Sequence, residues 1–331
     1  MAQDLEWLKQ RIPLLEYLQR HNWTGRHAST RQEYVGLCPL HREAHPSFYV
    51  NSCKNLFYCH GCGQGGDLIR FVQLFLRLPF RQAVAHLEQE LIPATASPLL
   101  EQAVNFYQLQ LDRHSEAVRY LEGRGLYDPA VIKELGIGYA PGGNLRCHLV
   151  GLGYPLDLLL DAGLINSQGR DAFCRRVIFP CTLHHQIVNI YGRSVGAAFP
   201  HRFLPHSKGG LFAWDAVQHF STIILVEGPF DVAVLWQAGF RNSTSAFGTN
   251  LTSNHIAQLC DQPGRLVYVA FDQDENQAGQ QASRRLSRLL KSAGLAVRVV
   301  QLPKGQDPAS YFEAGATAVD FTHCLQQART L

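Results

Sequence analysis

The feature that most restricts what this chain can fold into is a short segment with two pairs of metal-binding residues. Cys38 and His41 are separated by two residues, as are Cys59 and Cys62, and seventeen residues lie between the pairs. Each pair can turn two ligands toward one ion, and four Cys and His ligands are typical of a structural Zn²⁺ site. Because such a site leaves no coordination position open, we predict that this zinc stabilises the fold and performs no chemistry.

Three other residues of the same segment compete as ligands, namely Cys53, His45 and His60. None of them completes a two-residue spacing as well as the first four, and Cys53 is the main rival. The chain has nine cysteines, an odd number, which fits a reducing compartment with one metal site better than a disulfide framework. We expect the remaining five to be small buried hydrophobic residues. These are Cys147, Cys174, Cys181, Cys260 and Cys324.

Length and composition set broad limits on the class of protein. With 331 residues and 46% hydrophobic content, the chain can form two or three domains with cores of their own. It has no amino-terminal signal pattern and no apolar run of about eighteen residues. We therefore expect a soluble, cytoplasmic protein with no membrane partner. The net charge of +3 is too small to indicate a nucleic-acid partner by itself.

The periodicity of apolar residues divides the chain into a small β-rich part and a larger α/β part. The runs EYVGL, SFYV and NLFYC predict a small antiparallel sheet around the metal ligands. Between residues 67 and 90 the period is helical, with an interruption at Pro79. From residue 221 strands and helices alternate, which is typical of a parallel sheet with helices on its faces. The fold class is therefore α+β and multidomain: an antiparallel zinc ribbon followed by an α/β domain.

Acidic residues stand at the ends of two predicted parallel strands. Glu227 ends TIILVE, and Asp272 and Asp274 end RLVYVAFDQD. Open α/β sheets bind ligands at the carboxyl ends of their strands, and clustered carboxylates are a site for Mg²⁺ in phosphoryl chemistry. Asp307, after the strand AVRVVQL, lies at the same edge or caps the last helix. For Asp231 the sequence likewise leaves two roles open, namely capping of a helix and participation in this carboxylate site.

Basic residues precede these strands. In residues 171–210 the only acidic residue is Asp171, whereas five residues are basic. This local excess of positive charge predicts binding to the phosphates of a template or a nucleotide. The five are Arg175, Arg176, Arg193, Arg202 and Lys208.

Longer stretches resemble the DnaG-type bacterial primases. CPLHREAHPSFYVNSCKNLFYCHGCGQGGDLIRFV is similar to the CHC2 zinc-binding domain of that family, RRVIFPCTLHHQIVNIYGRS to its RNA polymerase domain, and LVEGPFDVAVLWQAGF to its Toprim module. From this resemblance we expect five parts along the chain. They are a zinc-binding domain at 1–92, a linker at 93–98, the N-terminal part of the polymerase domain at 99–220, a Toprim module at 221–315 and a tail at 316–331.

The resemblance implies a DNA-dependent RNA polymerase that joins ribonucleoside triphosphates into a primer on single-stranded DNA. It implies that Glu227, Asp272 and Asp274 are catalytic and hold Mg²⁺ or Mn²⁺. Asp307 matches an acidic position of the family after the last strand and joins these metal ligands. Arg193 and Arg202 match basic positions, and with Lys208 we expect them to bind nucleic acid or nucleotide.

The chain also departs from the family pattern. Its loop DQDENQAG is two residues longer than the family's DGDRAG-like loop and lacks the arginine. The chain ends shortly after the Toprim pattern, so we expect a plasmid, phage or mobile-element form, with a replicative helicase or mobile-element protein as a further partner. Two alternatives remain: a Toprim nuclease that uses the same metal site, and a non-catalytic, zinc-dependent protein that binds single-stranded DNA.

Overall fold

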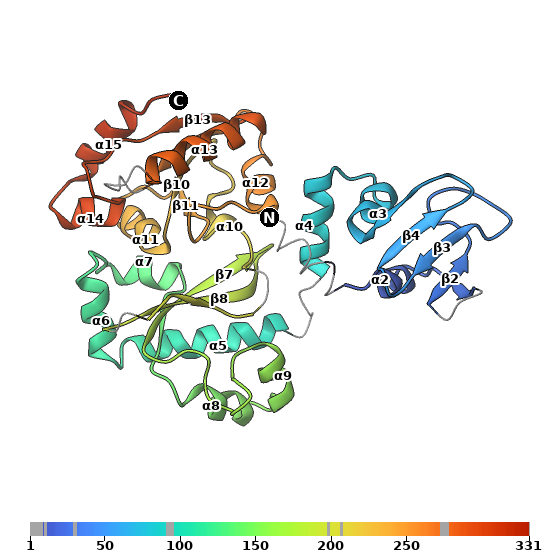
Figure 1. The fold of residues 1–331 in the computed structure, drawn as a ribbon. Coiled ribbons are helices and arrows are strands. Elements are labelled where there is room, and N and C mark those ends of the chain that lie inside the picture. The colour runs from blue at the N-terminus through green and yellow to red at the C-terminus, as the bar shows by residue number, and fades with distance from the viewer. Residues whose placement is uncertain are drawn as a thin grey trace. The chain divides into compact units, whose positions relative to one another are not determined.

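The structure is a computed structural model of the chain. It describes residues 9, 12–28, 32–90, 96–196, 199–205, 208–271 and 278–330 (Figure 1). The chain divides into two compact units, which are described separately below. The first comprises Met1–Ile92 and Thr252–Ala257, and the second Pro93–Leu251 and Gln258–Leu331.

The first unit is built on a five-stranded antiparallel sheet with the order β1-β2-β3-β4-β5. Its strands are β1 Gly25–His27, β2 Glu33–Gly36, β3 Phe48–Asn51, β4 Leu56–Cys59 and β5 Gly65–Asp67, and its helices are α2 Leu14–Arg20, α3 Leu68–Phe75 and α4 Phe80–Glu90. The antiparallel sheet predicted from the sequence is confirmed. β1 and β5 were not predicted, because strands of three residues are too short to show an alternating pattern.

A hydrophobic core on one face of this sheet supports the metal-binding turns. Phe48 and Phe57 are buried there, and the ring of Phe71 from α3 contacts them at 6.0 and 5.5 Å between centroids. Asp67 immediately precedes α3, and its side chain caps the helix by accepting a hydrogen bond of 2.9 Å from the Arg70 backbone N–H. The helix therefore starts directly after the sheet and presents its apolar face to it.

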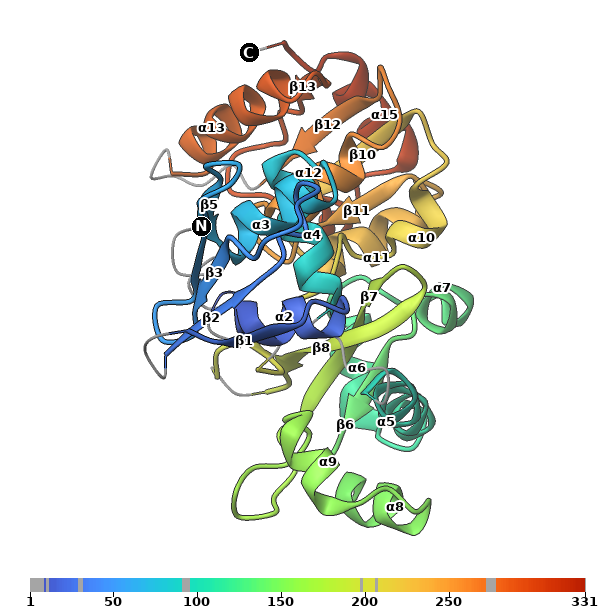
Figure 2. The same cartoon turned by 90° about the vertical axis from the view of Figure 1, so that its right-hand side faces the viewer.

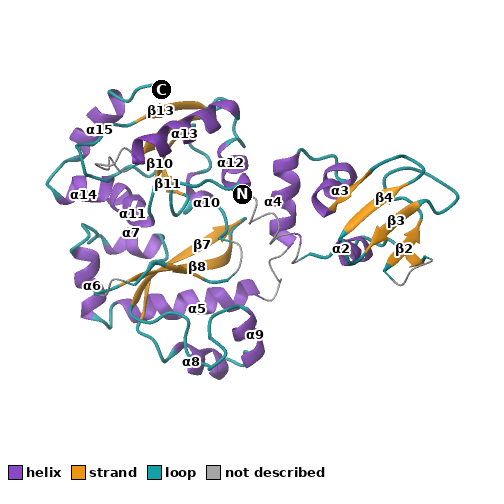
Figure 3. Ribbon diagram, viewed as in Figure 1, coloured by secondary structure: helices purple, strands orange, loops and turns teal. Residues whose placement is uncertain are grey.

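The second unit begins with an antiparallel sheet of the order β6-β7-β8-β9. Its strands are β6 Gly138–Ala140, β7 Arg176–Leu183, β8 Gln186–Ser194 and β9 Arg202–Phe203, and its helices are α5 Ala96–Leu111, α6 Ser115–Glu122, α7 Pro129–Glu134, α8 Leu145–Gly151 and α9 Leu156–Asp161. α5 packs along the sheet against β6 and β8 (Figure 3). α7 is capped by the side chain of Asp128 and has Pro129 at its first position, where a missing N–H costs no helical hydrogen bond.

The carboxyl-terminal half of this unit holds a parallel sheet of the order β11-β10-β12-β13 (Figure 2). Its strands are β10 Thr222–Val226, β11 Ser243–Ser245, β12 Leu266–Ala270 and β13 Ala296–Val299. The helices are α10 Trp214–Val217, α11 Pro229–Gln237, α13 Ala278–Ser292, α14 Pro308–Glu313 and α15 Ala318–Gln326. α12 Ser253–Leu259 is divided between the two units, because Thr252–Ala257 belongs to the first. The predicted parallel α/β arrangement is confirmed. α15 occupies the stretch that we expected to be a tail, and its Phe321 is buried.

The scattered cysteines differ partly from expectation. Cys181 is buried, and Cys260 and Cys324 are half-buried, but Cys147 and Cys174 are exposed. The prediction of burial was therefore wrong for these two, because Cys147 lies on an outer position of the short helix α8 and Cys174 in the turn before β7. In the described part of the chain, no helix has both the length and the apolar character that crossing a bilayer requires.

Candidate functional site

The four predicted zinc ligands come together at one end of the antiparallel sheet. The ligand atoms of Cys38, His41, Cys59 and Cys62 all lie within 4.8 Å of one another, and Cys59 Sγ is 3.8 Å from His41 Nδ1. Zn–S bonds of about 2.3 Å and Zn–N bonds of about 2.0–2.1 Å hold tetrahedral ligands at similar separations. The donor set and its spacing therefore fit a zinc ion.

The rival ligands take no part in this cluster. Cys53, His45 and His60 are exposed, and none of them joins the four grouped side chains. In each of the two ligand pairs, by contrast, a tight turn points a backbone N–H at the sulfur of the first residue. Leu40 N lies 3.4 Å from Cys38 Sγ, and Cys62 N lies 3.5 Å from Cys59 Sγ. Such N–H groups stabilise the negative charge of a thiolate ligand.

The outer face of the same sheet carries aromatic and basic side chains. Arg26, Val35, Tyr49 and Tyr58 follow one another in register across β1 to β4, so their side chains share a face, on which Val35 is buried. The Tyr58 side chain is 49% exposed. The exposed His60 ring packs edge-on against Tyr49 at 5.2 Å and against Tyr58 at 5.0 Å. This face offers flat rings and a cation to a ligand.

In the second unit, Glu227 stands at the carboxyl end of the parallel sheet. It follows β10, whose last residue, Val226, pairs with Ala270 at the end of β12. Glu227 is half-buried, and its backbone carbonyl oxygen accepts a hydrogen bond of 2.8 Å from Gly248 N. Asp272 and Asp274 lie outside the described residues, which stop at Phe271 on this side.

One buried carboxylate links the start of α11 to the start of α14. Asp231 is 5% exposed. Its Oδ2 accepts from Gly228 N at 3.0 Å and its Oδ1 from Ala309 N at 3.2 Å. Asp231 is therefore a capping residue that also joins two helices. Since Gly228 follows Glu227 and Ala309 is two residues after Asp307, these two acidic residues lie at the same edge of the sheet.

Asp307 itself caps α14. Its Oδ1 accepts hydrogen bonds of 2.6 Å from Ser310 N and from Ser310 Oγ. Of the two roles left open by the sequence, helix capping is thus present. Asp307 also lies at the edge of the sheet. Both capping hydrogen bonds end on Oδ1, so Oδ2 is the oxygen that a metal would take.

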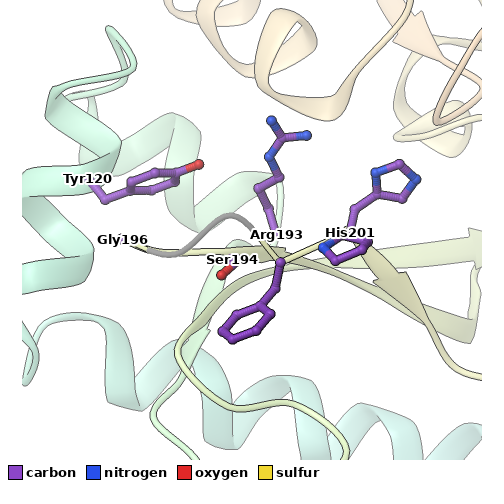
Figure 4. A pocket seen from close by; sticks show the side chains of 7 residues that line it. Tyr120, Arg193, Ser194, Gly196 and His201 are labelled. Carbon is purple, nitrogen blue, oxygen red and sulfur yellow. The ribbon is translucent and has the colours of Figure 1, made fainter.

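A pocket of about 440 Å³ opens beside β8 and the segment that leads to β9. Figure 4 shows Tyr120 extending from α6 toward β8, with Arg193 and His201 on the other side. Phe199, also in the wall, is 68% exposed. The residues that line the pocket are Tyr120, Arg193, Ser194, Gly196, Phe199, Pro200 and His201.

Arg202 and Lys208 flank this pocket without lining it. Arg202 is exposed on β9, opposite Gly192, and donates to Ala172 O at 3.1 Å. The Lys208 ammonium lies 4.8 Å above the ring of Phe203. Desolvation, followed by the charges of Arg193 and Lys208, lowers the pKa of His201. Positive charge is therefore concentrated around the pocket.

Aromatic rings connect the pocket to the carboxyl edge of the parallel sheet. Phe247 precedes Gly248, the partner of Glu227, and its ring contacts Tyr191 at 5.2 Å and Phe203 at 5.5 Å. On the other side Tyr120 contacts Phe230 of α11 at 5.9 Å. The pocket and the acidic edge are therefore neighbours within one unit.

Three family models match consecutive parts of the chain. Residues 2–96 match the CHC2 zinc finger, residues 106–215 the N-terminal domain of the DNA primase catalytic core, and residues 224–312 a Toprim-like model. A DNA primase of Aquifex aeolicus is 30% identical over 339 residues, covering 95% of this chain and 67% of the relative. The chain belongs to the DnaG-type DNA primase family. The cluster of Cys38, His41, Cys59 and Cys62 is accordingly a zinc site of the CHC2 type.

Other primases agree with this membership. A DNA primase of Pseudomonas aeruginosa is 33% identical over 347 residues, covering 91% of this chain and 51% of the relative. The zinc-binding and RNA polymerase domains of the Aquifex aeolicus primase superpose with a TM-score of 0.63 at 28% identity, over 98% of this chain and 85% of that chain. A primase catalytic domain bound to single-stranded DNA gives a TM-score of 0.61 at 28% identity, over 74% and 83%.

The chain spans about half the length of the Pseudomonas primase and about two thirds of the Aquifex primase. Within the shared part, the structure adds a residue that the sequence did not single out. The Arg124 guanidinium lies 5.3 Å from the ring of Phe230, and its buried Nε meets no hydrogen-bond partner among the described residues. Only the fold reveals this arginine, because it brings the end of α6 to the start of α11.

Proposed function

We propose that the chain synthesises primers on single-stranded DNA as a DNA-directed RNA polymerase. The observation that carries this proposal is the proximity of a basic pocket and an acidic sheet edge in one compact unit. Polymerisation of nucleotides needs both, because cations hold the phosphates of the substrate while carboxylates hold the metal that assists the reaction. The family relationship supports the same activity.

The acidic edge supplies the carboxylates of the proposed reaction. Glu227, Asp272 and Asp274 would hold Mg²⁺ or Mn²⁺, with Oδ2 of Asp307 as a further ligand. Carboxylate oxygens are the ligands that such hard cations prefer. When bound, the ions neutralise negative charge that develops on the attacking and leaving oxygens during nucleotidyl transfer. Asp231 holds the starts of α11 and α14 together beside this edge, through its hydrogen bonds with Gly228 N and Ala309 N.

The pocket would bind the incoming ribonucleoside triphosphate. Arg193 offers a planar guanidinium that can bind phosphate oxygens through two parallel hydrogen bonds. Arg202 and Lys208 add positive charge beside it, and the exposed Phe199 ring offers a surface on which a base can stack. Arg124, over the Phe230 ring of α11, is a further phosphate ligand on this proposal.

The zinc unit would bind the template strand. The outer face of its sheet presents Tyr49, Tyr58 and His60, with Arg26 two strands away from Tyr49, and rings of this kind stack on unpaired bases without regard to sequence. A primase catalytic domain similar to the second unit has been solved with single-stranded DNA, which supports DNA as a ligand of that unit. A replicative helicase or mobile-element partner and a cytoplasmic location remain predictions from the sequence.

One experiment separates this proposal from the two alternatives. The protein is incubated with single-stranded DNA, ribonucleotides and Mg²⁺ or Mn²⁺, beside an Asp272→Ala variant and an Asp112→Asn control at an exposed helix end. RNA primers made by the wild type and the control, but not by Asp272→Ala, support the proposal. DNA cleavage with the same dependence indicates a nuclease, and binding by all three proteins without any product indicates a binding protein.

A further inference from the structure

The His41 ring has two different surroundings at its two nitrogens. Nδ1 faces the sulfur ligands, at 3.8 Å from Cys59 Sγ. Nε2 faces Glu43, at 3.3 Å from Oε2. The Nε2 side is also closed by Gly61, where an added Cβ would lie 2.7 Å from Nε2 and 2.8 Å from Ser47 Oγ. Nδ1 therefore faces the sulfur ligands, whereas Nε2 faces Glu43 and Gly61.

Glu43 contacts the first ligand pair directly and is linked to the second through Ser47. Its side chain is only 11% exposed. Oε1 accepts from Cys38 N at 2.7 Å, within the first pair, and from Ser47 N at 3.1 Å. Oε2 accepts from the Ser47 hydroxyl. Ser47 Oγ in turn lies 3.2 Å from Cys59 Sγ and accepts from Gly61 N at 3.2 Å, within the second pair.

We propose that Glu43 is a positioning residue of the zinc centre. It holds His41 in the tautomer with its proton on Nε2, so that Nδ1 is the nitrogen that binds the ion. Through Ser47 it also fixes the first ligand pair relative to the second. This inference rests on the zinc site alone and does not depend on the proposed polymerase activity.

The chemistry of imidazole gives the reason for this role. A neutral ring carries one proton, and the nitrogen that binds zinc must be the unprotonated one. A carboxylate that accepts a hydrogen bond from the other nitrogen fixes both the tautomer and the orientation of the ring, and makes the ligand more basic. Ser47 has a single hydroxyl proton, and it is donated to Glu43. The serine oxygen therefore remains free to accept from Gly61, beside Cys62.

Substitution of Glu43 tests the proposal through zinc affinity. In Glu43→Gln the side chain keeps its length but has one acceptor oxygen in place of two, so it cannot accept on both sides. We expect the zinc affinity of the full chain to fall about 10- to 100-fold, measured by competition with a chromophoric chelator. The matched control is Glu33→Gln, at a half-buried glutamate of β2 in the same sheet. Unchanged affinity in Glu43→Gln would overturn the proposal.

A second measurement separates positioning from general support of the fold. NMR of isotope-labelled histidine rings in the zinc-loaded wild type reports which nitrogen of His41 carries the proton. We expect the proton on Nε2 and metal coordination by Nδ1, and the opposite tautomer would refute the proposal even if Glu43→Gln failed to fold. Ser47→Ala leaves Glu43 facing His41, so we expect the same tautomer and a smaller loss of affinity. A changed tautomer in Ser47→Ala would contradict the assignment to Glu43.

Discussion

The zinc centre and the metal site proposed at the acidic edge both gather polar side chains, yet they are assembled in different ways. The zinc ligands lie within residues 38–62, in two tight turns at one end of a sheet. The carboxylates follow different strands of the parallel sheet and extend from Glu227 to Asp307. The first site depends on local spacing and on the ion, whereas the second depends on a whole packed domain. Removing the organising element of each should therefore have different consequences.

The largest effect is expected from removal of zinc. Structural zinc contributes about 10–16 kcal/mol in small fingers, which is comparable with the whole stability of a domain at about 5–15 kcal/mol. We expect a chelator to abolish hydrogen-exchange protection in β2, β3 and β4 and to leave it intact in β10 and β12. The control is the same chelator saturated with zinc. Protection that survives in β3 and β4 would show that the small sheet folds without its ion.

In the second unit, a buried arginine joins separate segments of the chain, as the zinc ion does in the first. Arg265 is 0% exposed and lies over Trp214 at 5.0 Å. Its guanidinium donates to Phe220 O at 3.1 Å, to Gln258 O at 3.0 Å and to Leu259 O at 3.1 Å, and it also bonds to Asp261. It thus joins the chain after α10 to the end of α12, as zinc joins the two ligand pairs.

Arg265→Met should therefore destabilise the second unit and spare the first. The substitution leaves several buried carbonyl oxygens without donors, and the expected loss is about 3–5 kcal/mol in the free energy of unfolding. Hydrogen exchange in β10 and β12 during a urea titration measures it. The control is Arg298→Met, at an exposed position of β13, for which we expect a change within about 0.5 kcal/mol. Equal effects of the two substitutions would show that the buried guanidinium has no special role.

Glu227→Gln should separate activity from folding at the acidic edge. The substitution keeps the shape of the side chain. It also keeps the hydrogen bond that the backbone carbonyl of residue 227 accepts from Gly248 N, but it removes the charge proposed to hold Mg²⁺. We expect the loss of about 2–4 kcal/mol of transition-state stabilisation, so the rate of primer synthesis should fall about 30- to 1,000-fold. Zinc affinity and the thermal transition should not change. Full activity in this variant would exclude Glu227 as a metal ligand.

The same contrast explains what the sequence could predict. The ligands Cys38, His41, Cys59 and Cys62 were found from spacing, because two tight turns determine their geometry. The parallel sheet was found from the alternation of strand and helix. Glu43, Arg124 and Arg265 were not found, because their importance arises from contacts that only the folded chain makes. Charge and residue type alone do not distinguish a buried arginine from an exposed one.

The smallest effect, and the finest distinction, is expected at Asp307. Asparagine caps a helix about as well as aspartate, because the capping bond needs only one side-chain oxygen. In Asp307→Asn the amide oxygen can replace Oδ1 as the acceptor for Ser310 N, so the free energy of unfolding should change by less than about 0.5 kcal/mol. Asp307→Ala removes the cap and should cost about 1 kcal/mol.

Activity then decides between the two roles of this carboxylate. As a metal ligand through Oδ2, Asp307 loses its charge in both variants, so primer synthesis at limiting Mg²⁺ should fall in Asp307→Asn as much as in Asp307→Ala. As a cap alone, it would leave Asp307→Asn fully active. Because the asparagine variant keeps the helix start, any loss of activity in it reports the missing charge at the sheet edge and not a disturbed α14.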